Sequence, residues 1–151
     1  MRPYRPLKKA RPESAKPARA ASGGPRLSLC MIVKNEAKTL EKCLSLARPH
    51  VDEIVVLDTG STDGTQDIAR RYADVYDEVA WPGSFATARN LSLEKATGDF
   101  ILILDGDEWI ERDESWTMIR QAIAQPGFFL ARLPVRNLLG NGLVESDRFY
   151  Q

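Results

Sequence analysis

The chain has 151 residues, of which 43% are hydrophobic and 28% are charged, and its formal net charge at pH 7 is zero. This composition is typical of one globular domain with a core, and it excludes a collagen-like, coiled-coil or wholly disordered protein. The apolar run at 100–104 is far shorter than the ~20 residues of a membrane-spanning helix. With two cysteines and no signal-peptide pattern, we expect a reduced, cytoplasmic protein.

The first 26 residues differ from the rest in charge. They carry eight Lys or Arg and one acidic residue, a net charge of +7, whereas the remaining residues carry −7. Five prolines and few apolar residues predict that 1–26 is a disordered tail. Such a tail would bind anionic lipid at the inner face of a membrane, or nucleic acid, or would only keep the chain in solution.

From Leu27 onwards the sequence predicts strands that alternate with helices. Apolar runs without Gly or Pro predict a buried strand at 27–33 and further strands at 53–57 and 100–104. Apolar spacing and capping residues predict helices at 40–47, from Asp63 (the N-cap) to Tyr72, from Ser84 to Thr97 and at 114–125. Residues 128–133 and 142–145 predict a hairpin around the turn at 140–142. The alternation predicts an α/β fold, a doubly wound, mainly parallel sheet with helices on both faces.

Polar residues follow three of the predicted strands. The clusters are Lys34-Asn-Glu36, Asp58-Thr-Gly-Ser61 and Asp105-Gly-Asp107. Parallel strands end at one edge, where α/β sheets bind ligands, so we expect one site. Neighbouring carboxylates are costly to bury without a cation, and Mg²⁺ and Mn²⁺ prefer oxygen ligands. The acidic turn is therefore a metal site or, alternatively, a solvated turn.

One arginine lies on the predicted helix that starts at Ser84. Phe85, Ala88 and Leu91 predict that the face around Arg89 is mostly buried. A guanidinium in such a place holds a phosphate or a base edge, or else makes an internal salt bridge to a strand-end aspartate.

Four segments, in order and spacing, resemble the signatures of family 2 glycosyltransferases with the GT-A fold. They are residues 29–36, 56–65, 85–90 and 99–107. Two positions depart from the common pattern: Lys34 stands where many members have an aromatic residue, and Thr59 where many have a second aspartate.

The resemblance implies a nucleotide-sugar site, with the donor expected to be UDP-linked. The residues that it implies around the base and ribose are Lys34, Asn35, Glu36, Asp58 and Thr59. Arg89 would lie near the nucleotide, Asp105 near the ribose, and Asp107 on the Mn²⁺ or Mg²⁺ that bridges the diphosphate. The implied reaction is transfer of the sugar, with inversion, to an acceptor that the sequence does not identify.

An inverting enzyme needs a general base to deprotonate its acceptor. In the sequence after the acidic turn, we can assign no residue to this role. Glu145 and Asp147 read as surface charges. The chain therefore resembles the donor half of an enzyme, whose uncovered sheet edge favours self-association or a completing subunit. A non-catalytic nucleotide-binding or accessory module is the alternative function.

Other classes fit the sequence less well. Asp58-Thr-Gly-Ser61 also matches the active-site loop of aspartic proteases, but the helical patterns contradict the all-β fold that those enzymes need. No Gly-x-Gly-x-x-Gly follows the first strand, which argues against a dinucleotide-binding domain. His50 follows a proline at a helix end and is expected to face solvent rather than to act in a triad.

Overall fold

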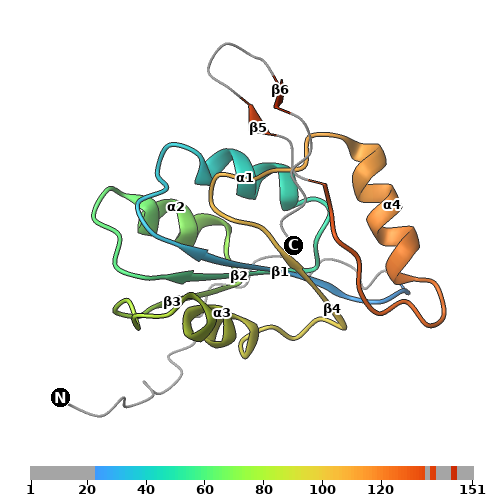
Figure 1. Ribbon diagram of the computed structural model, residues 1–151, viewed down its shortest axis with the longest axis horizontal. Coiled ribbons are helices and arrows are strands. Elements are labelled where there is room, and N and C mark those ends of the chain that lie inside the picture. Colours follow the sequence, from blue (N-terminus) through green and yellow to red (C-terminus); the bar gives the residue numbers. More distant parts are fainter. Residues whose placement is uncertain (1–22, 135–136, 139–143, 146–151) are drawn as a thin grey trace. The chain divides into compact units, whose positions relative to one another are not determined.

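Residues 23–134, 137–138 and 144–145 are described by the computed structural model shown in Figure 1. They fall into two compact units, one up to Trp109 and one from Ile110. The predictions for the basic tail, except at 23–26, and for Asp147 lie outside the described residues. Within the described ranges, no helix has both the length and the apolar character needed to cross a membrane.

The first unit is built on a four-stranded parallel sheet. Its strands are β1 (Leu27–Val33), β2 (Glu53–Asp58), β3 (Val75–Glu78) and β4 (Phe100–Ile103), and their order is β3-β2-β1-β4. The two central strands, β1 and β2, are almost completely buried, which explains their apolar runs. The outer strand β4 exposes Ile101 and Ile103 and pairs, among the described residues, with β1 only.

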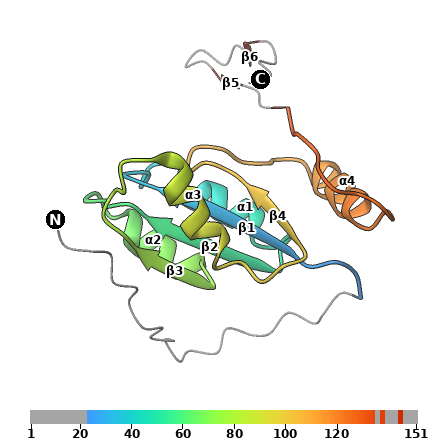
Figure 2. The same cartoon turned by 60° about the horizontal axis from the view of Figure 1, so that its bottom comes forward.

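Helices cover both faces of this sheet, as Figures 1 and 2 show. Helices α1 (Leu40–Ala47) and α2 (Thr65–Tyr72) lie on one face, and α3 (Phe85–Leu93) lies on the other. From β1 the chain proceeds to β2 and β3 on one side and then returns to place β4 on the other. This arrangement confirms the predicted doubly wound α/β fold and puts its topological switch point between β1 and β4.

The buried carboxylate of Glu53 joins several segments at the amino edge of the sheet, where its parallel strands begin. Glu53 Oε2 accepts hydrogen bonds from Ser28 Oγ (2.6 Å) and from the Thr97 amide (2.7 Å). Glu53 Oε1 accepts one from Thr97 Oγ1 (2.9 Å). A Cβ on Gly98 would lie 2.5 Å from Ser28 Oγ, so the chain before β4 needs a glycine here. The network ties β1, β2 and the α3–β4 connection together at the edge opposite the predicted site.

Several predicted boundaries are wrong for physical reasons. β3 was not predicted because its sequence, VYDE, has no apolar run, and its side chains are at most half-buried. α3 ends at Leu93 rather than at Thr97, whose amide and hydroxyl bond Glu53 instead. The N-cap of α2 is Gly64, with a φ of 94°, although the Asp63 carboxylate still accepts from the Thr65 amide (3.1 Å).

The second unit contains one helix and one antiparallel strand pair. Helix α4 runs over Asp113–Ile123, close to the predicted 114–125, and the Trp116 indole donates to the Ile110 carbonyl (3.3 Å). Strand β5 (Asn137–Leu138) pairs with β6 (Val144–Glu145). The predicted hairpin is thus confirmed as a pairing, but 128–133 is not its first strand.

Candidate functional site

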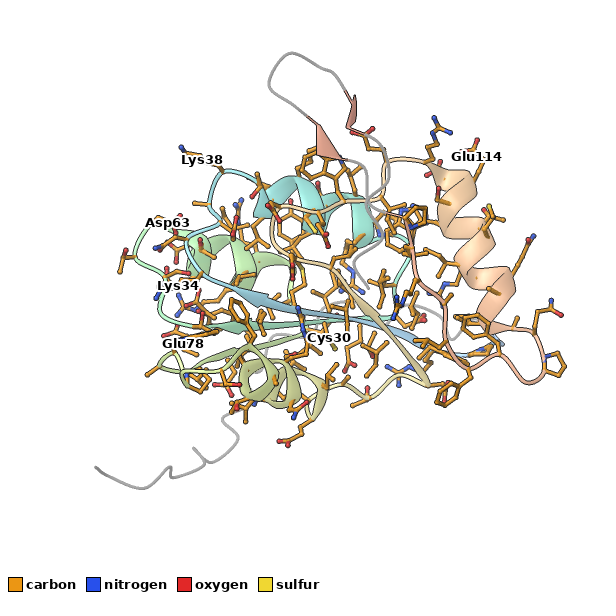
Figure 3. All side chains as sticks on the ribbon, in the orientation of Figure 1. Cys30, Lys34, Lys38, Asp63, Glu78 and Glu114 are labelled. Carbon is orange, nitrogen blue, oxygen red and sulfur yellow. The ribbon has the colours of Figure 1, made fainter. Side chains whose placement is uncertain are left out.

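The carboxyl edge of the sheet brings together the polar clusters that follow β1, β2 and β4. The register pairs Val33 with Asp58 and Asp58 with Glu78, so β1, β2 and β3 end side by side. Figure 3 shows Lys34, Asp63 and Glu78 at this same edge. Lys34 itself is exposed at the end of β1.

The loops after β1 and β2 are joined by hydrogen bonds. The Asn35 amide donates to Ser61 Oγ (2.9 Å), and Asn35 Oδ1 accepts from the Thr62 amide (2.8 Å). Asn35 has a φ of 58°, a left-handed conformation that asparagine tolerates better than most residues. The Glu36 amide donates to Thr65 Oγ1 (2.8 Å) at the start of α2. These hydrogen bonds therefore join the two loops into one connected surface.

Asp58 is fully buried at the end of β2, and its two carboxylate oxygens differ. Oδ1 accepts from the amides of Gly60 (2.8 Å) and Ser61 (2.7 Å). Oδ2 is buried and has no hydrogen-bond partner among the described residues. A buried acceptor without a donor is costly, so a ligand N–H or O–H that reached Oδ2 would satisfy it.

Thr59 is also buried, and it contacts the end of β1. Its amide and its hydroxyl both donate to the Val33 carbonyl, at 2.9 and 3.1 Å. The hydroxyl proton is therefore used within the sheet. A contact between Thr59 and a nucleotide stays a prediction.

Arg89 reaches from α3 to the switch point of the sheet. Its guanidinium donates to Asp105 Oδ1 (3.0 Å) and to the Cys30 carbonyl (3.4 Å). Its side chain is 22% exposed, whereas that of Asp105 is 60% exposed. The internal ion pair, which the sequence left as one of two alternatives, is thus present. It holds the guanidinium between the middle of β1, at Cys30, and the turn that follows β4.

The acidic turn after β4 packs against the loop after β1. The Asp105 amide donates to Glu108 Oε2 (3.0 Å), and Asp107 is exposed. A Cβ on Gly106 would lie 2.6 Å from Glu36 Cγ, which explains the glycine between the two aspartates. Among the described residues, no group of three or more His, Cys, Asp or Glu side chains is placed to hold a metal ion.

Gly106→Ala is expected to lower the free energy of unfolding by about 1–2 kcal/mol, because the added methyl group must displace Glu36. Thermal unfolding measures this as a fall of roughly 5 °C in the midpoint. Gly24→Ala is the matched control, since a Cβ there meets nothing within 4 Å. An equal effect of both substitutions would contradict the close packing of the two loops.

The two thiols are unsuited to nucleophilic chemistry. Burial, with smaller contributions from Glu108 and Asp107, raises the pKa of Cys43 on α1 to about 12. Burial, followed by the charge of Glu53, raises the pKa of Cys30 to about 11. Both thiols are therefore protonated at neutral pH, which excludes a thiolate nucleophile.

Sequence reasoning missed a pair of exposed aromatic side chains between β3 and α3. Trp81 and Phe85 pack edge to face, with ring centroids 4.8 Å apart and planes at 71°. Trp81 is 39% exposed and Phe85 is 74% exposed, so the prediction of a buried face at Phe85 is wrong. The sequence signal for this pair was weak: two aromatic residues on either side of a Pro-Gly turn.

The described site residues lie in a segment that matches a known family. The family model for glycosyl transferase family 2 matches residues 28–148. A TPR repeat-containing protein from Synechococcus elongatus is 45% identical over 101 residues, which cover 67% of this chain and 25% of that protein. Glycosyltransferase AglE from Haloferax volcanii is 36% identical over 107 residues, covering 60% of this chain and 35% of that protein.

A solved structure agrees with these matches. The mannosyltransferase PcManGT from Pyrobaculum calidifontis, in complex with GDP-Man and Mn²⁺, is 29% identical, with a TM-score of 0.53. The match covers 70% of this chain and 35% of that one. The structural neighbours are glycosyltransferases with the GT-A fold, which confirms the predicted fold. The present chain spans about a quarter to a third of the length of these relatives.

Proposed function

The chain belongs to glycosyltransferase family 2, and from this premise we propose that its carboxyl edge binds the nucleotide-sugar donor of a glycosyltransferase. The observation that carries the proposal is the buried, unpartnered Oδ2 of Asp58, at the edge where α/β sheets bind ligands. The other residues that we propose to contact the nucleotide belong to the loops after β1, β2 and β4 and to α3: Lys34, Asn35, Glu36, Thr59, Asp105 and Arg89. UDP is the first candidate nucleotide, and GDP is the second because PcManGT was solved with GDP-Man.

The acidic turn fits a divalent cation that is shared with the donor. Asp107 is exposed, and Asp105 and Glu108 supply carboxylate oxygens in the same turn. Mg²⁺ and Mn²⁺ are held in many nucleotide sites by one or two carboxylates together with phosphate oxygens, so a larger protein cluster is not required. We propose Asp107 as the metal ligand. The bound cation would neutralise the charge that develops on the departing diphosphate.

The complete enzyme would transfer the sugar, with inversion, from this site to an acceptor hydroxyl. Arg89 and Asp105 would hold the donor, and a base from outside the first unit would take the acceptor proton. The exposed edge of β4 is where a completing subunit or a second copy would add.

We propose the cytoplasm as the compartment, because both cysteines are free and buried. The basic tail at 1–26 would add contact with an anionic membrane.

The alternative is a nucleotide-binding module without catalysis. The chain covers a quarter to a third of its relatives, and no general base has been identified in it. Both functions require nucleotide binding, but hydrolysis or transfer of the sugar requires an enzyme. Turnover of a UDP-sugar by the chain separates them.

The proposal is tested by thermal unfolding of the 151-residue chain with UDP or GDP, in the presence of Mn²⁺ or EDTA. A ligand at about 100 times its Kd adds about 2.7 kcal/mol to the stability. This is roughly 5–10 °C in the midpoint for a domain of this size. The expected result is a shift with UDP and Mn²⁺ that EDTA removes. No shift with either nucleotide, in a protein that unfolds cooperatively, would contradict an autonomous donor site.

A further inference from the structure

The exposed aromatic pair lies at the same edge of the sheet as the proposed donor site. The Val79 amide donates to the Asp58 carbonyl (2.9 Å), so the chain that leaves β3 starts beside Asp58. Trp81 follows two residues later, and α3 begins at Phe85. The other end of α3 is at the amino edge, where the Thr97 amide bonds Glu53. The start of α3, with its aromatic pair, therefore lies at the carboxyl edge.

The helical position of Phe85 connects it to Arg89. Residues four apart lie on the same face of a helix, one turn from each other. Arg89 contacts Asp105 and the Cys30 carbonyl at the switch point. Phe85 is one turn nearer the start of α3, and so further out along the same edge. The ring extends the row of site residues towards solvent.

Two other aromatic rings of this unit are already in contact with the cationic group of a basic side chain. Lys42 Nζ lies 3.8 Å from the centroid of the Trp109 ring, and the Arg70 guanidinium carbon lies 4.8 Å from that of Tyr76. Trp81 instead packs edge to face with Phe85, which holds the phenyl ring in place while leaving it 74% exposed. A fixed ring open to solvent is suited to stacking with a flat ligand.

The polar surroundings indicate what kind of flat ligand this is. Asp58 Oδ2, on the strand that neighbours β3, is a buried acceptor without a donor. A carboxylate acceptor together with an aromatic ring matches a heterocycle that has an N–H on its edge and a π-face. The end of β1 offers the ammonium of Lys34 and no ring. These features favour a nucleobase over an acceptor sugar, which would need several hydroxyl partners.

We infer that Phe85, held by Trp81, is the surface on which the base of the nucleotide stacks. The inference rests on the proposed donor site and adds to it a residue that contacts the base. Stacking on an aromatic side chain depends on the ring and not on the phosphates. It predicts that base-bearing ligands, and not pyrophosphate, lose affinity when the ring is removed.

The test is calorimetric titration of the 151-residue chain with UDP and with pyrophosphate, both in the presence of Mn²⁺. Phe85→Ala is expected to weaken UDP binding about tenfold, by the loss of one base–aromatic stack. Phe85→Leu, which keeps apolar bulk without a ring, should weaken it as much. Phe85→Tyr should stay within about twofold of the wild type. Pyrophosphate should bind all these variants equally.

Phe129→Ala removes a comparably exposed ring in the second unit and is the matched control, expected to leave UDP binding unchanged. UDP binding to Phe85→Ala at the wild-type affinity would overturn the inference, and would assign the pair to a contact between chains if sedimentation showed that the variant loses self-association. Equal weakening of UDP and pyrophosphate would also overturn it, because the phosphate site would then be disturbed. Failure of the wild type to bind UDP or GDP would instead refute the proposed function.

Discussion

Asp107→Ala is expected to abolish the thermal stabilisation that UDP and Mn²⁺ produce together. The wild type should gain roughly 5–10 °C near saturation, and the variant less than about 1 °C. The reason is that Asp107, which is exposed at the carboxyl edge, is the residue proposed to ligate the cation, so without it the metal–nucleotide complex would lose its carboxylate ligand on the protein. Differential scanning fluorimetry with and without EDTA measures the effect.

Asp107→Ala removes a negative charge as well as the proposed metal ligand, so a control variant must remove a charge elsewhere. Glu94→Ala removes one exposed carboxylate at the end of α3, which is the amino edge of the sheet. This variant should respond to UDP and Mn²⁺ as the wild type does. Because the Asp107 side chain is exposed, both variants should unfold near the wild-type midpoint without ligand. A full ligand shift in Asp107→Ala would remove this residue from the metal site.

Glu53→Ala is expected to lower the free energy of unfolding by about 3 kcal/mol, because three donors then lose a buried charged acceptor. The midpoint should fall by roughly 10 °C. Glu53→Gln keeps the volume, and its amide oxygen can take the place of Oε2 while its N–H₂ donates to the Thr97 hydroxyl, so it should destabilise the protein less than Glu53→Ala. Urea unfolding followed by circular dichroism measures both effects.

The exposed Glu94 again serves for comparison, and Glu94→Ala should change the stability by less than about 0.5 kcal/mol. Because Glu53 lies at the amino edge, its variants should keep the Kd for UDP wherever they remain folded. A Glu53→Ala chain that is as stable as Glu94→Ala would show that the buried network contributes nothing to the fold.

Apolar patterning predicted the parts of the fold that are buried. The runs at β1 and β2 and the stripe of α1 (Leu40–Ala47) follow directly from burial on one or both faces. The run at β4 is equally apolar, but within the strand only Leu102 is buried. β3 has no such run because it is a half-buried outer strand. The end of α3 depends on Glu53, a residue more than thirty positions away, and no local pattern contains that information.

The carboxyl edge could be predicted in outline and not in detail. Three polar clusters after parallel strands identified the edge, since strand direction alone brings them together. The sequence could not show that Arg89 pairs with Asp105 or that one oxygen of Asp58 lacks a donor, because both depend on side-chain positions across the sheet. The sequence also predicted a mostly buried helix face that includes Phe85, whereas Phe85 is exposed, because apolar character alone does not show whether another element covers a side chain.

The ion pair between Arg89 and Asp105 affects which form of the donor this edge would accept. A diphosphate is anionic, and it would approach a turn that also carries the negative charges of Asp107 and Glu108. Arg89 neutralises the charge of Asp105 but not those of Asp107 and Glu108. The repulsion between the turn and the diphosphate is therefore reduced but not reversed. Free nucleotide would therefore meet a like-charge barrier at this turn, and the same nucleotide complexed with a divalent cation would meet a smaller one, because the cation cancels two of its negative charges. If the proposed donor site is correct, the net charge of the turn would favour the metal–nucleotide complex over the free nucleotide.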